Sequence, residues 1–309
     1  MSNFEMIRNI AYLEPQTSFS EMAKDEFCHM LKLEGRFSTP LTTIKQIVDY
    51  VAKNPDTVGV LPVENTLDGT IRESLDNLIL CKNPNIRIIS ELIMPIEYCL
   101  LSKTTEFYSI TGLIATPRLI GKCHEFIQNE LPRNLNLIEA PTMLESAFDL
   151  RNYNLTYASI GNKKIAETCM LNVLKENIHD DKNNKTRYIL IGDVETMPTG
   201  KDKTTVAFRT NHTPGALLEI LKIFLEHGIN LSYISSRPSK FEPNEYIFIV
   251  NFDGHLGDTE MLQAIEEIKR NNRLKKEKTF NLIKFYKNKG YSALEFLNAY
   301  RSLSEKECA

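Results

Sequence analysis

The sequence predicts an α/β protein with two lobes of similar size, followed by a smaller α+β domain. Three observations lead to this fold class. The chain has 309 residues, more than one hydrophobic core usually supports. Residues 10–192 contain two successive units in which short apolar strands alternate with amphipathic helices. From residue 204 the order becomes β-α-β-β-α-β within about 80 residues, which is the split βαβ sandwich of ferredoxin-like domains.

The first unit contains the stretch around which the chain is organised. Residues 10–13 and 58–63 are apolar runs with the length of buried strands, and two helices are expected between them. The second run becomes polar at Glu64, and a helical pattern begins at residue 71. Open α/β sheets place ligands at such strand-to-helix turns. An ordinary turn, with Asp68 and Thr70 as helix caps, explains the stretch equally well.

The second unit repeats this organisation. Residues 86–102 predict a long extended segment, interrupted at Pro95, that can carry the chain from one lobe to the next. Strands are expected at 111–115, 135–138 and 155–160, and helices begin near Pro117, Thr142 and Asn162. Two such units suggest two lobes with a cleft between them. A polar loop at 179–185 precedes a further strand at 186–192.

The last third of the chain divides into a linker, a small domain and a tail. We expect a two-lobed domain over 1–193, a linker over 194–203, the α+β domain over 204–287 and a C-terminal helix within 288–309. Such a small sandwich leaves a sheet face or an edge exposed and usually pairs with another copy of itself. The final amphipathic helix is assigned no role beyond packing or dimerisation.

Composition and missing motifs exclude several classes of function. The chain has 37 basic and 40 acidic residues and a net charge of −3, so a nucleic-acid partner is not expected. Without a signal peptide or a long apolar run, no membrane association is expected either. The six cysteines show no CxxC spacing, which predicts reduced thiols in a cytoplasmic protein. The histidines are isolated and no glycine-rich phosphate loop occurs, so neither a metal site nor a cofactor is expected.

The chemistry that remains comes from hydroxyl, amide and cationic groups at strand ends. Arg187 could pair with a carboxylate through two hydrogen bonds, and Asn65 could orient that carboxylate. Thr186 could donate a hydrogen bond to a departing oxygen, acting through geometry because a hydroxyl is a poor general acid. Taken alone, a strand start with a surface cation is the favoured explanation of Thr186 and Arg187.

The chain shows the motifs YLEPQTSFS at 12–20, PVENTLDG at 62–69 and NKTRY at 184–188. Taken together and in order, these motifs resemble those of the prephenate dehydratases that carry a C-terminal ACT regulatory domain. That family shows YLGPxGTFS, then PxENSxxG, then SHPQ followed by QC, then NxTRF. The match in order and spacing extends over residues 10–192, and the resemblance to an ACT domain runs from 204 to 286.

The resemblance implies two lobes like those of periplasmic binding proteins, with prephenate in the cleft. The reaction would be loss of carbon dioxide and water to give phenylpyruvate, in the biosynthesis of phenylalanine. Aromatisation drives this reaction, so the protein need only hold the dianion and help hydroxide leave. By family position the catalytic residues would be Thr186, Glu64 and Asn65. The residues expected to bind the substrate or support the site are Thr17, Ser18, Thr66, Lys122 and Arg187.

The chain departs from the family pattern near the expected site. Glu14 and Thr17 replace the two glycines of the first motif, which reduces backbone freedom at a turn that should approach the substrate. Ala115 stands in place of the serine of SHPQ, and Lys122 in place of the glutamine before the cysteine. Arg118 and Lys122 lie four residues apart, so both could face one cleft as a carboxylate clamp, or form a solvated basic helix face.

The ACT resemblance implies L-phenylalanine as an allosteric ligand, bound between subunits of a homodimer or homotetramer. GALL at 215–218 fits the family's GALV, residues 230–232 fit its GINLT-like strand, and SRP at 236–238 fits ESRP with Ser235 in place of the acid. The residues expected to bind the effector are Gly215, Ala216, Leu217, Asn230, Ser236 and Arg237. A purely structural role for the turn glycine and Arg237 is the alternative.

Three hypotheses follow for the function. The first is a feedback-regulated prephenate dehydratase, a carbon–oxygen lyase, because Thr186, Asn65 and Glu64 are retained. The second is an arogenate dehydratase or a non-aromatising prephenate decarboxylase, which draws on the departures at Thr17, Ala115 and Lys122. The third is a non-catalytic regulator that binds an amino acid in its ACT domain.

Overall fold

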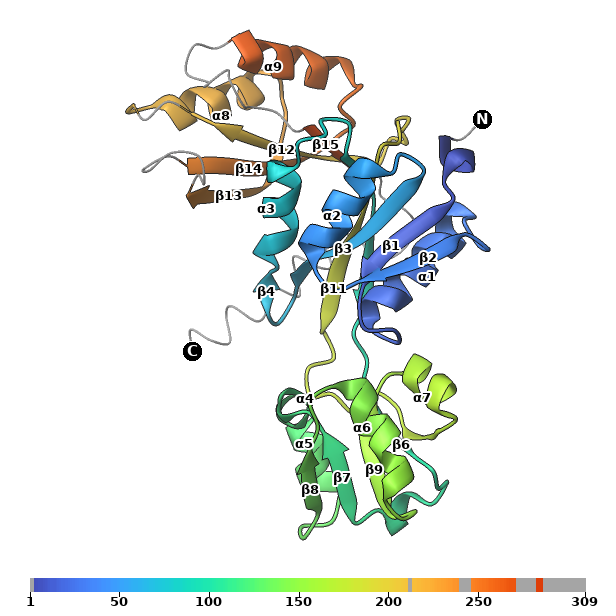
Figure 1. The fold of residues 1–309 in the computed structure, drawn as a ribbon. Coiled ribbons are helices and arrows are strands. Elements are labelled where there is room, and N and C mark those ends of the chain that lie inside the picture. Colours follow the sequence, from blue (N-terminus) through green and yellow to red (C-terminus); the bar gives the residue numbers. More distant parts are fainter. Residues whose placement is uncertain (1–2, 211–212, 239–245, 271–281, 286–309) are drawn as a thin grey trace.

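The computed structural model describes residues 3–210, 213–238, 246–270 and 282–285, and these residues form three β-sheets (Figure 1). The strand orders are β2-β1-β3-β11-β5 with β4 beside β3, then β10-β6-β9-β7-β8, then β13-β14-β12-β15. The first two sheets belong to two lobes and the third to a C-terminal domain, which confirms the predicted fold class. The expected C-terminal helix lies outside the described residues.

The first lobe is a mixed sheet with helices on both faces. β1, β2 and β3 are parallel, whereas β11 is antiparallel to both β3 and β5. One face packs against α1 and the other against α2 and α3. The elements are β1 (Asn9–Leu13), α1 (Phe19–Leu31), β2 (Phe37–Leu41), α2 (Ile44–Lys53), β3 (Thr57–Asn65), β4 (Gly69–Thr70), α3 (Arg72–Leu80), β5 (Arg87–Pro95) and β11 (Lys185–Gly192).

The second lobe contains five short strands and four short helices. The chain enters it between β5 and β6 and returns between β10 and β11, so two segments connect the lobes (Figure 1). The elements are β6 (Cys99–Ser102), β7 (Gly112–Ala115), α4 (Pro117–Lys122), α5 (His124–Glu130), β8 (Asn136–Glu139), α6 (Met143–Asp149), β9 (Tyr157–Gly161), α7 (Lys163–Cys169) and β10 (Asn172–Lys175). Single 3-10 turns lie at Asn3–Met6, Phe107–Ser109 and Leu150–Asn152.

Two local differences from the sequence-based elements have physical causes. The edge strand β2 has no apolar run, because it pairs only with β1 and stays half exposed, so its sequence gives no strand signal. The single helix expected after Pro117 is divided at Cys123. Asp180 causes the break: its N–H donates to the carbonyl of Lys122 at 2.9 Å, and its carboxylate accepts the N–H of Glu125 at 3.1 Å.

The C-terminal domain has the predicted β-α-β-β-α-β order. Its elements are β12 (Lys203–Arg209), α8 (Ala216–Glu226), β13 (Leu231–Pro238), β14 (Tyr246–Asp253), α9 (Thr259–Arg270) and β15 (Leu282–Phe285). Both helices cover one face of the sheet. The other face is not left open, because Ala207, Ile247 and Ile249 pack against Leu75 and Ile79 of α3 in the first lobe. β13 also extends through residues 235–238, which the sequence suggests are a turn.

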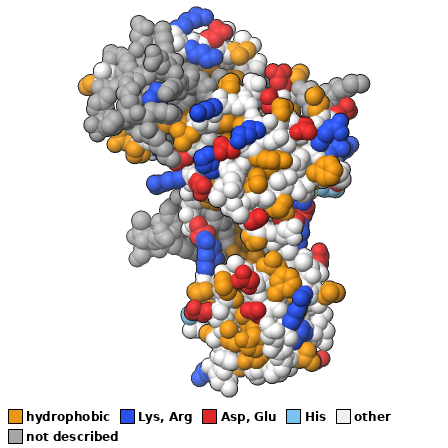
Figure 2. All heavy atoms as spheres, viewed as in Figure 1, with side chains coloured by type: hydrophobic (Ala, Val, Ile, Leu, Met, Phe, Trp, Pro, Cys, Tyr) orange, Lys and Arg blue, Asp and Glu red, His pale blue; other side chains and the backbone are white. Residues whose placement is uncertain are grey.

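The surface agrees with the near-neutral composition. On the face seen in Figure 2, the described basic and acidic side chains are interspersed, without a continuous patch of one sign. Within the described residues, no helix is long and apolar enough to cross a membrane.

Candidate functional site

A cleft of about 460 Å³ lies between the two lobes. The side chains from the first lobe lie at the carboxyl end of β3, at the start of β11 and at the start of α1. Those from the second lobe come mainly from α4. The lining residues are Phe19, Ser20, Pro62, Asn65, Asp68, Ile71, Ile96, Tyr98, Thr116, Arg118, Leu119, Lys122, Met143, Thr186 and Tyr188. The cleft therefore lies where the sequence predicts a ligand, at a strand-to-helix turn.

Strand alternation separates the residues that the sequence groups together. Asn65 is opposite Thr186 and Glu64 is opposite Arg187 in the β3–β11 pair. Neighbours along a strand point to opposite faces, and residues directly across from each other share a face. Asn65 and Thr186 line the cleft, whereas Glu64 and Arg187 lie behind the sheet. The expectation that Glu64 and Arg187 contact the substrate therefore does not agree with this geometry.

The Asn65 side chain holds the Thr186 hydroxyl. Its Nδ2 donates to Thr186 Oγ1 at 2.9 Å, to Asn184 Oδ1 at 2.9 Å and to the carbonyl of Lys185 at 3.1 Å. Its Oδ1 accepts the backbone N–H groups two and three residues later, both at 2.9 Å. Because Thr186 Oγ1 accepts this bond, its own proton is available for donation into the cleft.

Thr66 fixes the loop before β11 rather than lining the cleft. Its buried hydroxyl accepts the N–H of Lys185 at 2.9 Å and donates to the carbonyl of Asn183 at 2.9 Å. The hydroxyl thus donates one bond and accepts one within the protein, and Thr66 is not among the residues that line the cleft, so its role here is structural.

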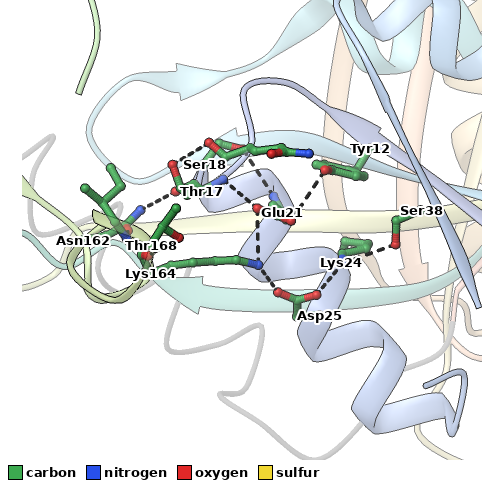
Figure 3. A network of polar contacts seen from close by, with 12 residues as sticks. Tyr12, Thr17, Ser18, Glu21, Lys24, Asp25, Ser38, Asn162, Lys164 and Thr168 are labelled. Atoms are coloured by element: carbon green, nitrogen blue, oxygen red, sulfur yellow. Dashed lines mark hydrogen bonds and ion pairs between the residues drawn. The ribbon is translucent and has the colours of Figure 1, made fainter. Parts of the chain in front are cut away.

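Thr17 and Ser18 are also absent from the lining of the cleft. Thr17 has a φ of 68°, a backbone conformation that favours glycine, and it is buried. Its N–H donates to the Glu21 carboxylate at 2.6 Å, and its carbonyl accepts Asn162 Nδ2 at 2.8 Å (Figure 3). Ser18 caps α1 by accepting the N–H of Glu21 at 3.3 Å. The contacts of Thr17 hold its backbone in a conformation that the family's glycine adopts without strain. Phe19, the residue after Ser18, lines the cleft.

The same network joins the two lobes on one side of the cleft. Lys164, near the start of α7, pairs with Glu21 at 3.3 Å and also with Asp25, both in α1 (Figure 3). Lys24 forms a second ion pair with Asp25. Together with the Asn162–Thr17 bond, these contacts tie the start of α7 to the start of α1.

A second bridge joins the lobes inside the cleft. Asp68, in the turn after β3, accepts hydrogen bonds from Arg118 at 2.5 Å and from Lys122 at 3.1 Å, both in α4. Burial alone would raise the pKa of Asp68, but the hydrogen bonds from Lys122 and Arg118 outweigh it and hold that pKa below its ordinary value. Lys122 thus lines the cleft as expected, and Arg118 faces the same space, as their four-residue spacing suggests.

Behind the sheet, Arg187 pairs with the buried Glu91 and with the partly buried Glu64. Its Nε donates to Glu91 at 2.8 Å, and its Nη1 lies 3.9 Å from Glu64. Lys203, the first residue of β12, lies 3.9 Å from Glu91. Burial raises the pKa of Glu64, and the charge of Arg187 opposes that rise. The motifs do not include Glu91, but an acid inside an apolar strand, as Glu91 is in β5, signals a buried partner.

The expected effector residues separate into three groups. Gly215, at the start of α8 with a φ of 83°, is exposed, as are Asn230 and Ser236. Ala216 is buried in the domain and Leu217 packs against its core. Arg237, by contrast, leaves its own domain: it donates to the carbonyl of Arg72 at 2.9 Å and forms an ion pair with Asp76, both in α3.

No group of His, Cys, Asp or Glu suited to a metal ion occurs among the residues that the structure describes. The polar side chains that line the cleft carry hydroxyl, amide, carboxylate and cationic groups. A cleft with two cations and an oriented hydroxyl can hold an anion and donate a hydrogen bond to a departing oxygen.

Comparison with known proteins assigns the chain to a family. The family model for prephenate dehydratase matches residues 10–196, and the ACT domain model matches residues 204–270. A bifunctional chorismate mutase/prephenate dehydratase from Aquifex aeolicus is 31% identical over 260 residues, which cover 84% of this chain and 69% of that protein. A prephenate dehydratase from Methanocaldococcus jannaschii is 32% identical over 266 residues, 84% of this chain and 94% of that one.

A solved structure agrees with both matches. The prephenate dehydratase from Arthrobacter aurescens in complex with L-Phe superimposes with a TM-score of 0.72 and 26% identity, covering 97% of this chain and 100% of that chain. Both lobes and the C-terminal domain are included in that superposition. The chain therefore belongs to the prephenate dehydratase family and carries an ACT domain after its dehydratase domain.

Proposed function

We propose that this protein converts prephenate to phenylpyruvate, acting as a carbon–oxygen lyase, and that Thr186 is its catalytic residue. The observation that carries the proposal is the hydrogen bond from Asn65 to Thr186 on the wall of the cleft. This bond orients the hydroxyl oxygen as an acceptor and leaves its proton available for donation to a ligand. Family membership supplies the substrate, and the two cations of α4 suit a dianion.

The reaction needs little covalent chemistry from the protein. The bond between the ring and its carboxylate breaks, carbon dioxide leaves, and the electron pair enters the ring. The ring hydroxyl leaves at the opposite carbon as hydroxide, and the ring becomes aromatic. Thr186 donates a hydrogen bond to that oxygen as negative charge develops on it, which lowers the barrier electrostatically.

The geometry supports revised roles for the other residues expected in the site. Asn65 is a positioning residue for Thr186, and Lys122 binds a substrate carboxylate. Glu64 and Arg187 support the sheet from behind, through their ion pair. Thr17, Ser18 and Thr66 maintain the backbone of the turns around the cleft.

The test is conversion of prephenate, followed by the ultraviolet absorbance of phenylpyruvate. Thr186→Val keeps the shape of the side chain without its hydroxyl, so we expect kcat to fall about 10²- to 10³-fold. Thr186→Ser restores the hydroxyl and should recover most of that loss. Equal rates for the valine variant and the unmodified protein would refute the role of Thr186.

The same assay separates the competing activities. Prephenate consumed without phenylpyruvate would indicate a decarboxylase that does not aromatise the ring. Arogenate is assayed in parallel, because its ammonium group could pair with Asp68 in the cleft. A higher kcat/KM for arogenate than for prephenate would replace the proposed substrate.

We further propose that L-phenylalanine binds the ACT domain of a homodimer or homotetramer and inhibits the reaction. Support comes from the Arthrobacter aurescens enzyme, whose structure is a complex with L-Phe, and from the exposed Gly215, Asn230 and Ser236. Arg237, bound to α3, would transmit the effect rather than contact the effector. Arg237→Ala should then weaken inhibition more than it weakens phenylalanine binding measured by calorimetry, and size-exclusion chromatography reports the assembly.

A further inference from the structure

Three charged residues meet across the cleft, and none of them is prescribed by the family motifs. Asp68 occupies a variable position of PxENSxxG, whereas Arg118 and Lys122 stand where SHPQ and QC carry glutamine. Among the described residues that line the cleft, these three are the ones with charged side chains.

We propose that Arg118 and Lys122 form a carboxylate-binding pair that selects a dianionic substrate, and that Asp68 competes with the substrate for this pair. The proposal rests on the proposed function for the identity of the substrate. In this proposal Asp68 occupies the position of a substrate carboxylate in the free protein, and Asp68 leaves the cation pair when the substrate binds.

The geometry of the contact is that of a bound carboxylate. A single oxygen, Asp68 Oδ2, accepts from Arg118 at 2.5 Å and from Lys122 at 3.1 Å. Charge-assisted bonds of this kind are strong and directional, so any carboxylate that enters must replace Asp68 to gain them. The two donors come from successive turns of one helix face, which keeps them together when Asp68 departs.

Exposure shows which members of the trio can move. The Lys122 side chain is only 18% exposed and belongs to the wall of the cleft, whereas Arg118 is 67% and Asp68 42% exposed. The backbone N–H of Asp68 stays bound to Asn65. Release of Asp68 therefore needs only a rotation of its side chain and leaves the Asn65–Thr186 contact intact.

The charge balance favours a dianion. With Asp68 paired, the trio carries a net charge of +1, and once Asp68 has moved into solvent the pair presents +2 to the ligand. Prephenate carries two carboxylates, so the exchange matches its charge. The amides of the family pattern could hydrogen-bond to a carboxylate but would add no charge, so this cleft should depend more strongly on ionic strength.

The proposal predicts whether each substitution raises or lowers the KM for prephenate. Asp68→Asn removes the competitor and should lower the KM for prephenate about three- to tenfold with kcat nearly unchanged, as expected for two partly exposed ion pairs. Lys122→Gln should raise KM by a similar factor. Asp68→Asn should have a smaller effect in that background, where Arg118 is the cation still paired with Asp68. If Asp68 instead positioned the cations, Asp68→Asn would raise KM, which would overturn the proposal.

A binding experiment separates this proposal from the proposed function. Calorimetry at low salt compares phenylsuccinate, which has two carboxylates, with 3-phenylpropionate, which has one. We expect tighter binding of the dicarboxylate, a further three- to tenfold gain in Asp68→Asn, and loss of the preference in Lys122→Gln. Equal affinities for the two probes, no measurable binding of either, or weaker binding by Asp68→Asn would each refute the carboxylate pair.

Controls keep the result independent of folding and of overall charge. Lys175→Gln removes one positive charge from an exposed lysine that pairs with Glu130 on the second lobe, away from the cleft lining. It should leave the affinities for both probes within twofold. Thermal unfolding of each variant shows that it is folded. A protein that binds the dicarboxylate as expected but forms no phenylpyruvate would refute the proposed function and retain the carboxylate pair.

Discussion

Replacing Asn65 with alanine tests the central claim about the site, that one amide positions the catalytic hydroxyl. The substitution removes the 2.9 Å bond to Thr186, two further donor bonds to Asn184 and Lys185, and two accepted backbone bonds in the turn that follows β3. Without its donor, the Thr186 hydroxyl can rotate and the start of β11 is less constrained. We expect a larger loss in kcat than in affinity for prephenate.

The magnitude follows from the contacts. A buried polar group left without its partner costs about 1–3 kcal/mol, and water from the cleft can replace some of the lost bonds, so the free energy of unfolding should fall by about 2–4 kcal/mol. Loss of one oriented donor in an active site typically costs about 10²-fold in kcat, equivalent to about 2.7 kcal/mol. Steady-state kinetics and urea unfolding measure the two quantities separately.

Thr66→Val provides the matched control. It removes two hydrogen bonds from the same loop, those to Asn183 and Lys185, but leaves the Asn65–Thr186 contact in place. We expect it to destabilise the protein by about 1–2 kcal/mol and to lower kcat only slightly. If Thr66→Val lost as much kcat as Asn65→Ala, or if Asn65→Ala kept kcat within threefold, the positioning argument would be wrong.

Three further predictions concern the lobe contacts and the pH dependence of stability. Lys164→Met removes the cation that binds Glu21 and Asp25, so closure of the lobes should weaken. We expect the KM for prephenate to rise about fivefold, equivalent to roughly 1 kcal/mol. An unchanged KM would mean that this ion-pair bridge does not contribute to closure. Burial raises the pKa of Glu64 above 4.5, so the native state binds its proton more tightly, and stability is lost as pH rises from 4.5 through the native pKa. Glu64→Gln should therefore gain stability relative to the unmodified protein over that pH range. Urea unfolding at a series of pH values measures this gain. A difference in unfolding free energy that does not change with pH would contradict the prediction. Burial lowers the pKa of His179 below 6.5, so stability is lost as pH falls from 6.5 through the native pKa. His179→Gln should therefore reduce the fall in Tm over this pH range. Parallel plots of Tm against pH for the two proteins would exclude His179 as the cause of that fall.

The parts of the fold that the sequence predicts are those with strong periodicity. The helix after Thr43 buries Ile44, Ile47, Val48 and Val51, the face that its i, i+3, i+4, i+7 spacing indicates. The four-residue spacing of Arg118 and Lys122 likewise indicates that both lie on one helix face, in a cleft or in solvent, and in the structure both line the cleft. These features need only local geometry, which a single sequence contains.

Glu64 shows that strand geometry limits what a motif predicts. The motif groups Glu64 with Asn65, yet adjacent residues on a strand face opposite ways. Since Asn65 and Thr186 face the cleft, the period of two already directs Glu64 and Arg187 behind the sheet, where Arg187 also binds Glu91. A motif identifies positions that matter without saying which of them meet the ligand.

Contacts between distant segments could not be predicted. Lys164 and Glu21 are brought together by the arrangement of the lobes, and no pattern in either segment refers to the other. The positive φ of Thr17 is similar, because a β-branched residue adopts it only where surrounding contacts, here from Glu21 and Asn162, hold the backbone.

Both its sequence motif and its contacts in the structure bear on the role of Arg237. Its motif associates it with an effector, and its contacts associate it with α3, through Asp76 and the carbonyl of Arg72. α3 follows directly on the turn that carries Asp68, and Ile71 at its start lines the cleft. A shift of the ACT sheet relative to the first lobe would therefore act on the helix that begins at the cleft, and the Asp68 pair with Arg118 and Lys122 is the cleft contact closest in sequence to that helix. Coupling by this route requires only that one helix move as a unit, which is a smaller demand than a chain of side-chain rearrangements.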